Sequence, residues 1–329
     1  MRHIAAAVVV GALALAGAFI VASAALQPAA REARQQVVVI PPGASLSQIA
    51  ALLADAGVLR SPTAFVVAAR VRGVGGRLQW GEYLLSAAMS PLEILDRLAR
   101  GQVLLHRVTI PEGYTAVQIA DLLAKAGLAE REAFLRLVRE EGDSFALDFL
   151  EGRRDLEGYL FPDTYAFPRG LPPRQIVQAM LARFDQRVTP ALRREIRAQG
   201  VTLHEALTIA SMVEREARLA AERPVIAGVI YNRLRRGWRL EIDATVLYAL
   251  GRSNGPLTAA DLLVDSPYNT YRQTGLPPGP ISNPGLAAIE AAARPAVTPY
   301  LFYVLRPDGS HAFSSTLQEH QRNVRRWRR

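Results

Sequence analysis

The sequence predicts an α+β protein with three parts: an N-terminal membrane-spanning helix, a small module of strands and helices, and a larger, mainly helical domain that ends in a β-hairpin. Three observations support this prediction. They are an uncharged apolar run near the N-terminus, a repeat at a fixed offset of 70 residues, and a succession of helical segments from Pro173 to Leu250. The predicted boundaries are 1–35 for the membrane anchor and linker, 36–105 for the small module and 106–329 for the larger domain.

The composition of the 329 residues excludes several classes of function. The chain has 39 Lys and Arg against 30 Asp and Glu, a net charge of +9. Lys125 is its only lysine, and the arginines are scattered except in the C-terminal tail, so we expect no nucleic-acid partner. Cysteine is absent, which excludes disulfides, thiolate metal sites and cysteine nucleophiles. The five histidines lack metal-ligand spacing, and no nucleotide-binding or serine-hydrolase motif is present, so we expect neither a metal ion nor another cofactor.

The apolar run extends from Ile4 to Leu26, 23 residues without a charge. At about 1.5 Å per residue, a helix of this length crosses a hydrocarbon core of roughly 30 Å. A cleaved signal peptide is the alternative, because Ala22-Ser23-Ala24 resembles a cleavage site. The apolar core of a signal peptide is usually only about 7–15 residues long. We therefore expect an uncleaved single-pass anchor, residues 4–26, with the N-terminus in the cytoplasm and the rest of the chain exported.

The repeat begins with Ile40-Pro41-Pro42-Gly43 in one copy and with Ile110-Pro111-Glu112-Gly113 in the other. Each copy predicts a short strand, a turn of proline and glycine, and an N-capped helix that a glycine ends. Residues 106–155 thus repeat residues 36–85. One interpretation is two βα units of a mixed domain. The other is that the module at 36–105 resembles LysM modules, which hold polymers of N-acetylglucosamine, and the residues leave both interpretations open.

One predicted helix, Leu203–Arg218, carries two carboxylates within its apolar arc. At about 100° per residue, Glu214 and Glu216 both fall among the apolar side chains of this helix. Poor solvation favours the neutral acid, which is the form that a general acid needs to protonate a glycosidic oxygen. The alternative is that both glutamates form ion pairs with nearby arginines such as Arg215 and Arg223. The spacing alone does not decide between them.

Five stretches from about Leu156 to the end carry a resemblance to a known family: Glu157–Tyr165, Ala210–Glu216, Val229–Leu234, Tyr268–Tyr271 and Gly275–Gly285. In these stretches the sequence resembles the endolytic murein transglycosylase family, the YceG-like group of bacterial cell-wall enzymes. The resemblance implies cleavage inside peptidoglycan glycan strands, between N-acetylmuramic acid and N-acetylglucosamine, that leaves a 1,6-anhydro-muramyl end. It also implies a lysozyme-like catalytic helix, a catalytic domain in the periplasm beside the inner membrane, and peptidoglycan synthases as candidate partners.

The resemblance assigns the catalytic role to Glu216, the second member of the Glu-x-Glu pair. Glu216 would protonate the leaving oxygen and then accept the proton of the muramyl 6-hydroxyl, which attacks C1 of its own sugar, so that neither water nor a second carboxylate is required. Two other functions remain open: a membrane-tethered peptidoglycan-binding protein without turnover, and a lysozyme-type hydrolase. Residues that we expect to contact the substrate or to support the acid are Glu214, Asn232, Asp243, Tyr268 and Asn269.

Overall fold

The computed structural model describes residues 24–31 and 34–327, which form two compact units. The first unit comprises the described residues up to His106 together with Ala166–Gly170. The second comprises the remaining residues, from Arg107 onward. The α+β class that the sequence predicts is confirmed, since helices dominate and the strands form small two-stranded sheets.

The predicted membrane anchor, Ile4–Leu26, lies almost entirely outside the described residues. Among the residues that the structure does describe, no helix combines the length and the apolar character that crossing a bilayer requires. The anchor therefore stays a prediction.

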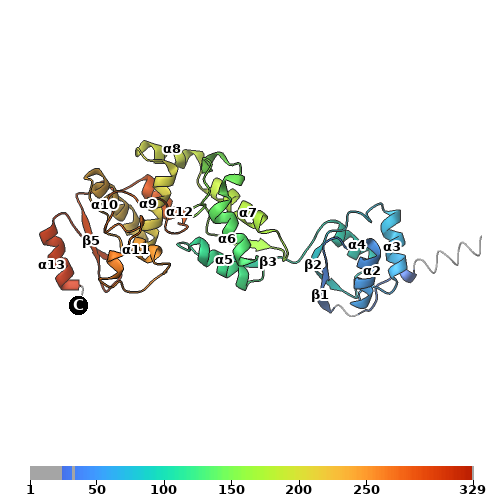
Figure 1. The fold of residues 1–329 in the computed structure, drawn as a ribbon. Helices are drawn as coiled ribbons and strands as arrows, with labels where there is room; N and C mark the ends of the chain where they lie inside the picture. The colour runs from blue at the N-terminus through green and yellow to red at the C-terminus, as the bar shows by residue number, and fades with distance from the viewer. Residues whose placement is uncertain (1–23, 32–33, 328–329) are drawn as a thin grey trace, which may run out of the picture. The chain divides into compact units, whose positions relative to one another are not determined.

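The first unit packs helices against a two-stranded antiparallel sheet (Figure 1). Side chains alternate along its first strand, so that Val38 and Ile40 are buried while Val37 and Val39 are about half exposed. The buried side chains of both strands and of all three helices form one core. Its elements are β1 (Gln35–Ile40), α2 (Leu46–Asp55), α3 (Pro62–Val71), β2 (Gly81–Ser86) and α4 (Pro91–Ala99).

The second copy of the repeat has the same order of strand, helix, helix and strand. Its first helix is capped like that of the first copy: Ser45 in one and Thr115 in the other form a capping box with a glutamine three residues later. The closing strand lies beyond residue 155 and is hydrogen-bonded to the first strand. The elements are β3 (His106–Thr109), α5 (Ala116–Lys125), α6 (Arg131–Glu140), the 3₁₀ turns η1 (Gly142–Ser144) and η2 (Asp148–Leu150), and β4 (Thr164–Phe167).

The rest of the second unit is a helical cluster built around α9 (Leu203–Glu216) (Figure 1). Thr202 and Glu205 form a capping box at its start, and its residues 206–213 are all buried. Helices α8, α10, α11 and α12 pack against it. The elements around it are α7 (Pro173–Arg187), α8 (Pro190–Ala198), η3 (Ala220–Glu222), α10 (Arg223–Arg235), α11 (Asp243–Ala249), η4 (Asp261–Leu263) and α12 (Leu286–Ala293).

A β-hairpin and a helix end the described chain. The strands β5 (Phe302–Leu305) and β6 (His311–Ser314) pair antiparallel, with Phe302 opposite Ser314, where the sequence predicts a hairpin. The final helix, α13 (Leu317–Trp327), packs against both strands. The segment from Pro277 to Gly285, which is rich in proline and glycine, contains neither helix nor strand.

Candidate active site

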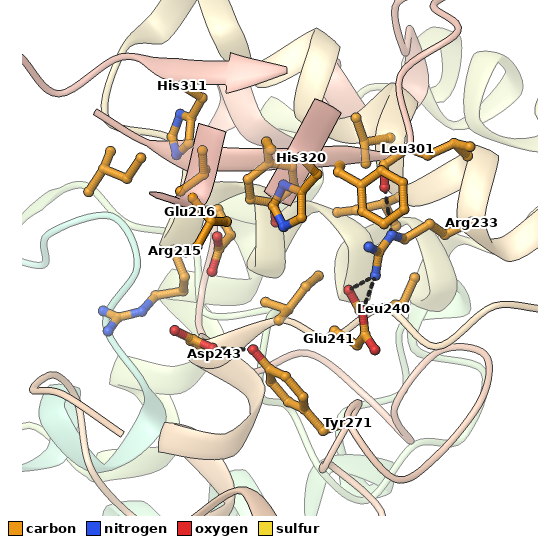
Figure 2. Close-up of a pocket in the computed structure, with 18 of the residues that line it drawn as sticks. Arg215, Glu216, Arg233, Leu240, Glu241, Asp243, Tyr271, Leu301, His311 and His320 are labelled. Carbon is orange, nitrogen blue, oxygen red and sulfur yellow. Dashed lines mark hydrogen bonds and ion pairs between the residues drawn. The ribbon is translucent and has the colours of Figure 1, made fainter. Parts of the chain in front are cut away.

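A cavity of about 600 Å³ opens at the C-terminal end of α9. Its walls come from α9, α10, the start of α11, the hairpin β5–β6 and α13 (Figure 2). Two acids lie on one side of the cavity in this view, and an arginine with a third acid lies on the other. The polar side chains that line it include Arg215, Glu216, Arg218, Arg233, Glu241, Asp243, Tyr271, Tyr303, His311 and His320.

Glu216 is the last residue of α9 and is partly buried in this cavity. The backbone leaves the helical conformation at the next residue, since Ala217 has φ −73° and ψ 118°. The capping box at the other end of α9 and the buried apolar face between them fix the helix in place. The packed and capped helix α9 therefore holds the carboxyl of Glu216 at the cavity.

The surroundings of Glu216 favour its protonated form. Burial, followed by the negative charge of Asp243, raises the pKa of Glu216 to about 7, although the Tyr303 hydroxyl, the backbone N–H of Ala244 and the charge of Arg215 act in the opposite direction. A carboxyl with this pKa is present in both protonation states near neutral pH. Glu216 can therefore give a proton and take one back, as a general acid and base must.

Asp243 faces the same cavity from the first turn of α11. The hydroxyl of Tyr271 donates a hydrogen bond of 2.5 Å to its carboxylate (Figure 2). The cavity thus combines one carboxyl that is readily protonated with a second one held by a phenol. Of the residues predicted as substrate contacts, Asp243 is the one that the structure brings beside Glu216.

Glu214 has a different environment, although it lies only two residues earlier. Its side chain is 8% exposed and lies 3.5 Å from Arg223, and it accepts a hydrogen bond of 2.9 Å from the backbone N–H of Gly285. The charge of Glu214, after burial, raises the pKa of nearby Glu112. Glu214 does not line the cavity. Glu214 therefore forms an ion pair with an arginine, which was one interpretation of the two glutamates. Glu216 has surroundings that favour the protonated acid, which was the other interpretation.

The remaining predicted contacts lie away from this cavity and bond to the protein itself. The side-chain amide of Asn232 donates to the carbonyls of Thr298 and Tyr300, both at 2.8 Å. Asn269 is completely buried and donates to two backbone carbonyls at 2.9 Å. The ring of Tyr268 packs 4.9 Å from that of Tyr248. The side chains of these three residues therefore form contacts within the second unit.

A second buried acid, Glu157, has its pKa raised to about 8 by burial. It is 4% exposed and accepts hydrogen bonds from the backbone N–H of Ala116 at 3.0 Å and from the side chain of Asn283 at 2.8 Å. Asn283 in turn accepts hydrogen bonds from the backbone N–H groups of Gly158 and Leu160, both at 2.9 Å. Hydrogen bonds thus join the stretches Glu157–Tyr165 and Gly275–Gly285 outside the cavity.

Three residues that line the cavity were not predicted from the sequence: Tyr271, Tyr303 and His311. Tyr303 is hydrogen-bonded to Glu216, and burial followed by the charge of Glu216 raises its pKa well above the ordinary value. Tyr271 belongs to Tyr268–Tyr271, one of the stretches that carry the family resemblance, so the sequence contained a signal for this residue. The other two lie in the hairpin, more than 80 residues after Glu216, and only the fold brings them to the end of α9.

Comparisons with known proteins show which family this chain belongs to. The sequence model of the YceG-like family matches residues 38–326. An endolytic murein transglycosylase of Bacillus subtilis is 35% identical over 325 residues, covering 94% of this chain and 90% of the relative. A protein of the same name from Streptococcus pneumoniae is 33% identical over 316 residues, and the match spans 57% of its length. A crystal structure of a yceG-like protein from Listeria monocytogenes superposes with a TM-score of 0.61 at 34% identity, covering 89% of this chain and 100% of that one. This chain therefore belongs to the YceG-like family.

Proposed function

We propose that this protein is an endolytic lytic transglycosylase that cleaves peptidoglycan glycan strands between N-acetylmuramic acid and N-acetylglucosamine and leaves 1,6-anhydro-muramyl ends. The observation that carries the proposal is the carboxyl of Glu216, held in a cavity with a pKa of about 7. Relatives named endolytic murein transglycosylase at 33–35% identity support the substrate class. Endolytic cleavage of this kind would limit the length of nascent strands.

The chemistry requires one proton donor and a nucleophile that the substrate itself supplies. Protonated Glu216 transfers its proton to the glycosidic oxygen, and the bond from this oxygen to C1 of the muramyl sugar breaks. The 6-hydroxyl of the muramyl sugar then forms the new bond to C1 and gives up its proton, which ionised Glu216 can accept. Because the attack is intramolecular, its entropic cost is small.

The test compares two glutamates on one helix. Glu216→Gln keeps the size of the side chain but cannot donate a proton, so we expect a loss of at least about 10⁴-fold, the upper end of what general acid–base catalysis contributes. Glu214→Gln is the matched control, because this residue lies outside the cavity, and we expect it to retain most activity. Mass spectrometry of the glycan ends, beside circular dichroism and thermal melts, reads out both variants.

The products also separate the alternative functions. Anhydro ends identify a transglycosylase, reducing ends identify a lysozyme-type hydrolase, and the absence of cleavage identifies a binding protein. Parental activity in Glu216→Gln would refute the proposed acid. An inactive Glu214→Gln beside an active Glu216→Gln would transfer the role to Glu214.

We further propose that residues 4–26 anchor the protein in the inner membrane, with the catalytic unit outside the cytoplasm. The support is the length of the uncharged run, 23 residues. Membrane fractionation and sequencing of the mature N-terminus test it. A soluble form that begins near Ala25 would show a cleaved signal peptide instead.

The first unit is proposed to bind glycan without chemistry, as its resemblance to LysM modules implies. The exposed valines of β1 and the partly exposed indole of Trp80 provide apolar surface on which a sugar ring can lie. Calorimetric titration of full-length Glu216→Gln with N-acetylglucosamine oligomers should show affinity that Trp80→Ala weakens. Equal affinity in both would show that this surface does not bind the oligomers.

A further inference from the structure

A histidine–glutamate pair at the cavity has no part in the scheme given so far. Nδ1 of His311 lies 2.7 Å from Oε2 of Glu222, and the backbone N–H of His311 donates to Oε1 of Glu222 at 2.9 Å. His311 begins β6 and Glu222 ends η3, so both carboxylate oxygens are used to join two separate elements. The side chain of His311 is 3% exposed, and its ring lines the cavity beside Glu216 (Figure 2).

The partner on Nδ1 determines what the other ring nitrogen can do. A carboxylate at Nδ1 keeps the proton on that atom, so that Nε2 of the neutral ring carries a free lone pair. Within the described part of the chain, no side chain or backbone group is hydrogen-bonded to Nε2 of His311. The ring also meets Tyr303 edge-on, with the ring centres 5.4 Å apart and an angle of 85°. Since Tyr303 is hydrogen-bonded to Glu216, contacts on two sides fix the ring next to the acid.

We propose that His311, oriented by Glu222, is the base that accepts the proton of the attacking sugar hydroxyl. This inference rests on the proposed function. It assigns to His311 the acceptance of the proton, a role that the scheme above gives to Glu216. A hydroxyl, an imidazole and a carboxylate in series form the arrangement of the serine hydrolase triad, in which the base takes the hydroxyl proton through Nε2 while the carboxylate stabilises the imidazolium. Here the substrate, and not a serine, supplies the hydroxyl.

The step balances with two separate groups. Glu216 gives its proton to the glycosidic oxygen, which takes the electron pair of the breaking bond to C1. The 6-oxygen donates a lone pair to form the new bond to C1, and its proton passes to Nε2 of His311. The enzyme is then left with an ionised Glu216 and an imidazolium paired with Glu222. Transfer of the proton from His311 to Glu216 through water in the cavity restores both groups.

Attack from the same side of the sugar fits this arrangement. The 6-oxygen and the leaving oxygen of a β-linked muramyl residue lie on the same face of the ring, as the bicyclic product requires. The group that accepts the 6-hydroxyl proton must therefore lie beside the acid and not across the sugar from it. His311 and Glu216 lie on the same side of the cavity (Figure 2). Tyr303 contacts the ring of His311 and is hydrogen-bonded to Glu216.

The test uses two variants of the full chain, one that replaces only Nδ1 of the ring and one that removes the ring. In His311→Asn, the amide nitrogen takes the place of Nδ1 and can still donate to Glu222, but the acceptor at Nε2 is lost. We expect at least about a hundredfold loss of anhydro ends, the lower end of the usual contribution of a general base. In His311→Gly, added imidazole should restore part of the activity. The matched control is His106→Gln, because Nε2 of His106 lies 2.6 Å from Glu82, outside the cavity, and the amide nitrogen of glutamine takes the place of Nε2.

A second measurement does not depend on how the histidine variants fold. Full-length Glu216→Gln labelled with ¹⁵N-histidine is titrated with uncrosslinked glycan strands, and the Nε2 signal of His311 should move as it accepts a hydrogen bond. If strands bind in the cavity but this signal stays in place, or if folded His311→Asn forms anhydro ends at the parental rate, the inference is overturned. If the parental protein forms no anhydro ends, the proposed function fails first, and the two failures are therefore distinguishable.

Discussion

Asp243 is one of the two main causes of the raised pKa of Glu216, and it is the one that a single substitution can remove. Burial and Asp243 raise this pKa from its ordinary value of 4.5 to about 7. At pH 7, a carboxyl with a pKa of about 7 is protonated in about half of the molecules, whereas one with a pKa of 4.5 is protonated in roughly one of 300. Asp243→Asn keeps the size of the side chain and can still accept the hydrogen bond of Tyr271, but it has no charge. Because a neighbouring negative charge disfavours a second one, its removal lowers the pKa of Glu216.

We expect the alkaline limb of the pH–rate profile to move to lower pH in Asp243→Asn. Each unit of this shift lowers the rate above the limb about tenfold, while the rate near pH 5 is kept. The assay is the initial rate of formation of new glycan ends, measured by mass spectrometry between pH 4 and 9. The control is Glu241→Gln, which removes another negative charge from the cavity, one that lies 3.0 Å from Arg233.

Three results would refute this reasoning. An unchanged limb in Asp243→Asn would mean that burial alone raises the pKa of Glu216. An equal shift in Glu241→Gln would mean that any negative charge in the cavity has this effect. Loss of activity at every pH would give Asp243 a direct part in the chemistry, as the second carboxylate of a hydrolase has.

Two further predictions concern a hydroxyl and a glycine. Tyr303→Phe removes a hydrogen bond that lowers the pKa of Glu216, so the alkaline limb should move to higher pH in the same assay, opposite to the shift in Asp243→Asn. Gly158→Ala places a Cβ against the ring of Pro280 at a φ of +88°, and we expect a loss of about 2 kcal/mol or more in the free energy of unfolding, measured by thermal melts. Gly152→Ala, at a φ of +72° but with open space around it, should cost less, and an equal loss in both would show that backbone strain alone decides.

The local signals in the sequence predicted the elements well, because short-range physics determines them. The caps at Ser45 and Thr115 form as side-chain hydrogen bonds to the helix start, and the glycines that follow these two helices have positive φ. The hairpin also forms around its Pro-Asp-Gly turn. Each of these features depends on residues within about five positions of one another.

The site could be predicted only in part. The helical wheel placed Glu214 and Glu216 among apolar side chains alike, since a wheel says nothing about what packs against each position. Their difference arises from distant segments: Arg223 and Gly285 bond to Glu214, whereas Tyr303 and the start of α11 surround Glu216. Long-range packing also occupies Asn232 with backbone carbonyls, which its place in a motif does not indicate.

The two copies of the repeat differ in the turn that, in the second copy, lies against α9. Ala44 of the first copy corresponds to Tyr114, whose carbonyl accepts hydrogen bonds from both the backbone and the side chain of Asn283. Pro42, which is exposed in the first copy, corresponds to Glu112, whose pKa is raised by burial and by the charge of Glu214, two residues before Glu216. The helix caps, by contrast, are the same in both copies. The turns of the two copies thus differ, whereas their caps are the same. We expect this difference if the second copy keeps the fold of the first while its turn packs against α9.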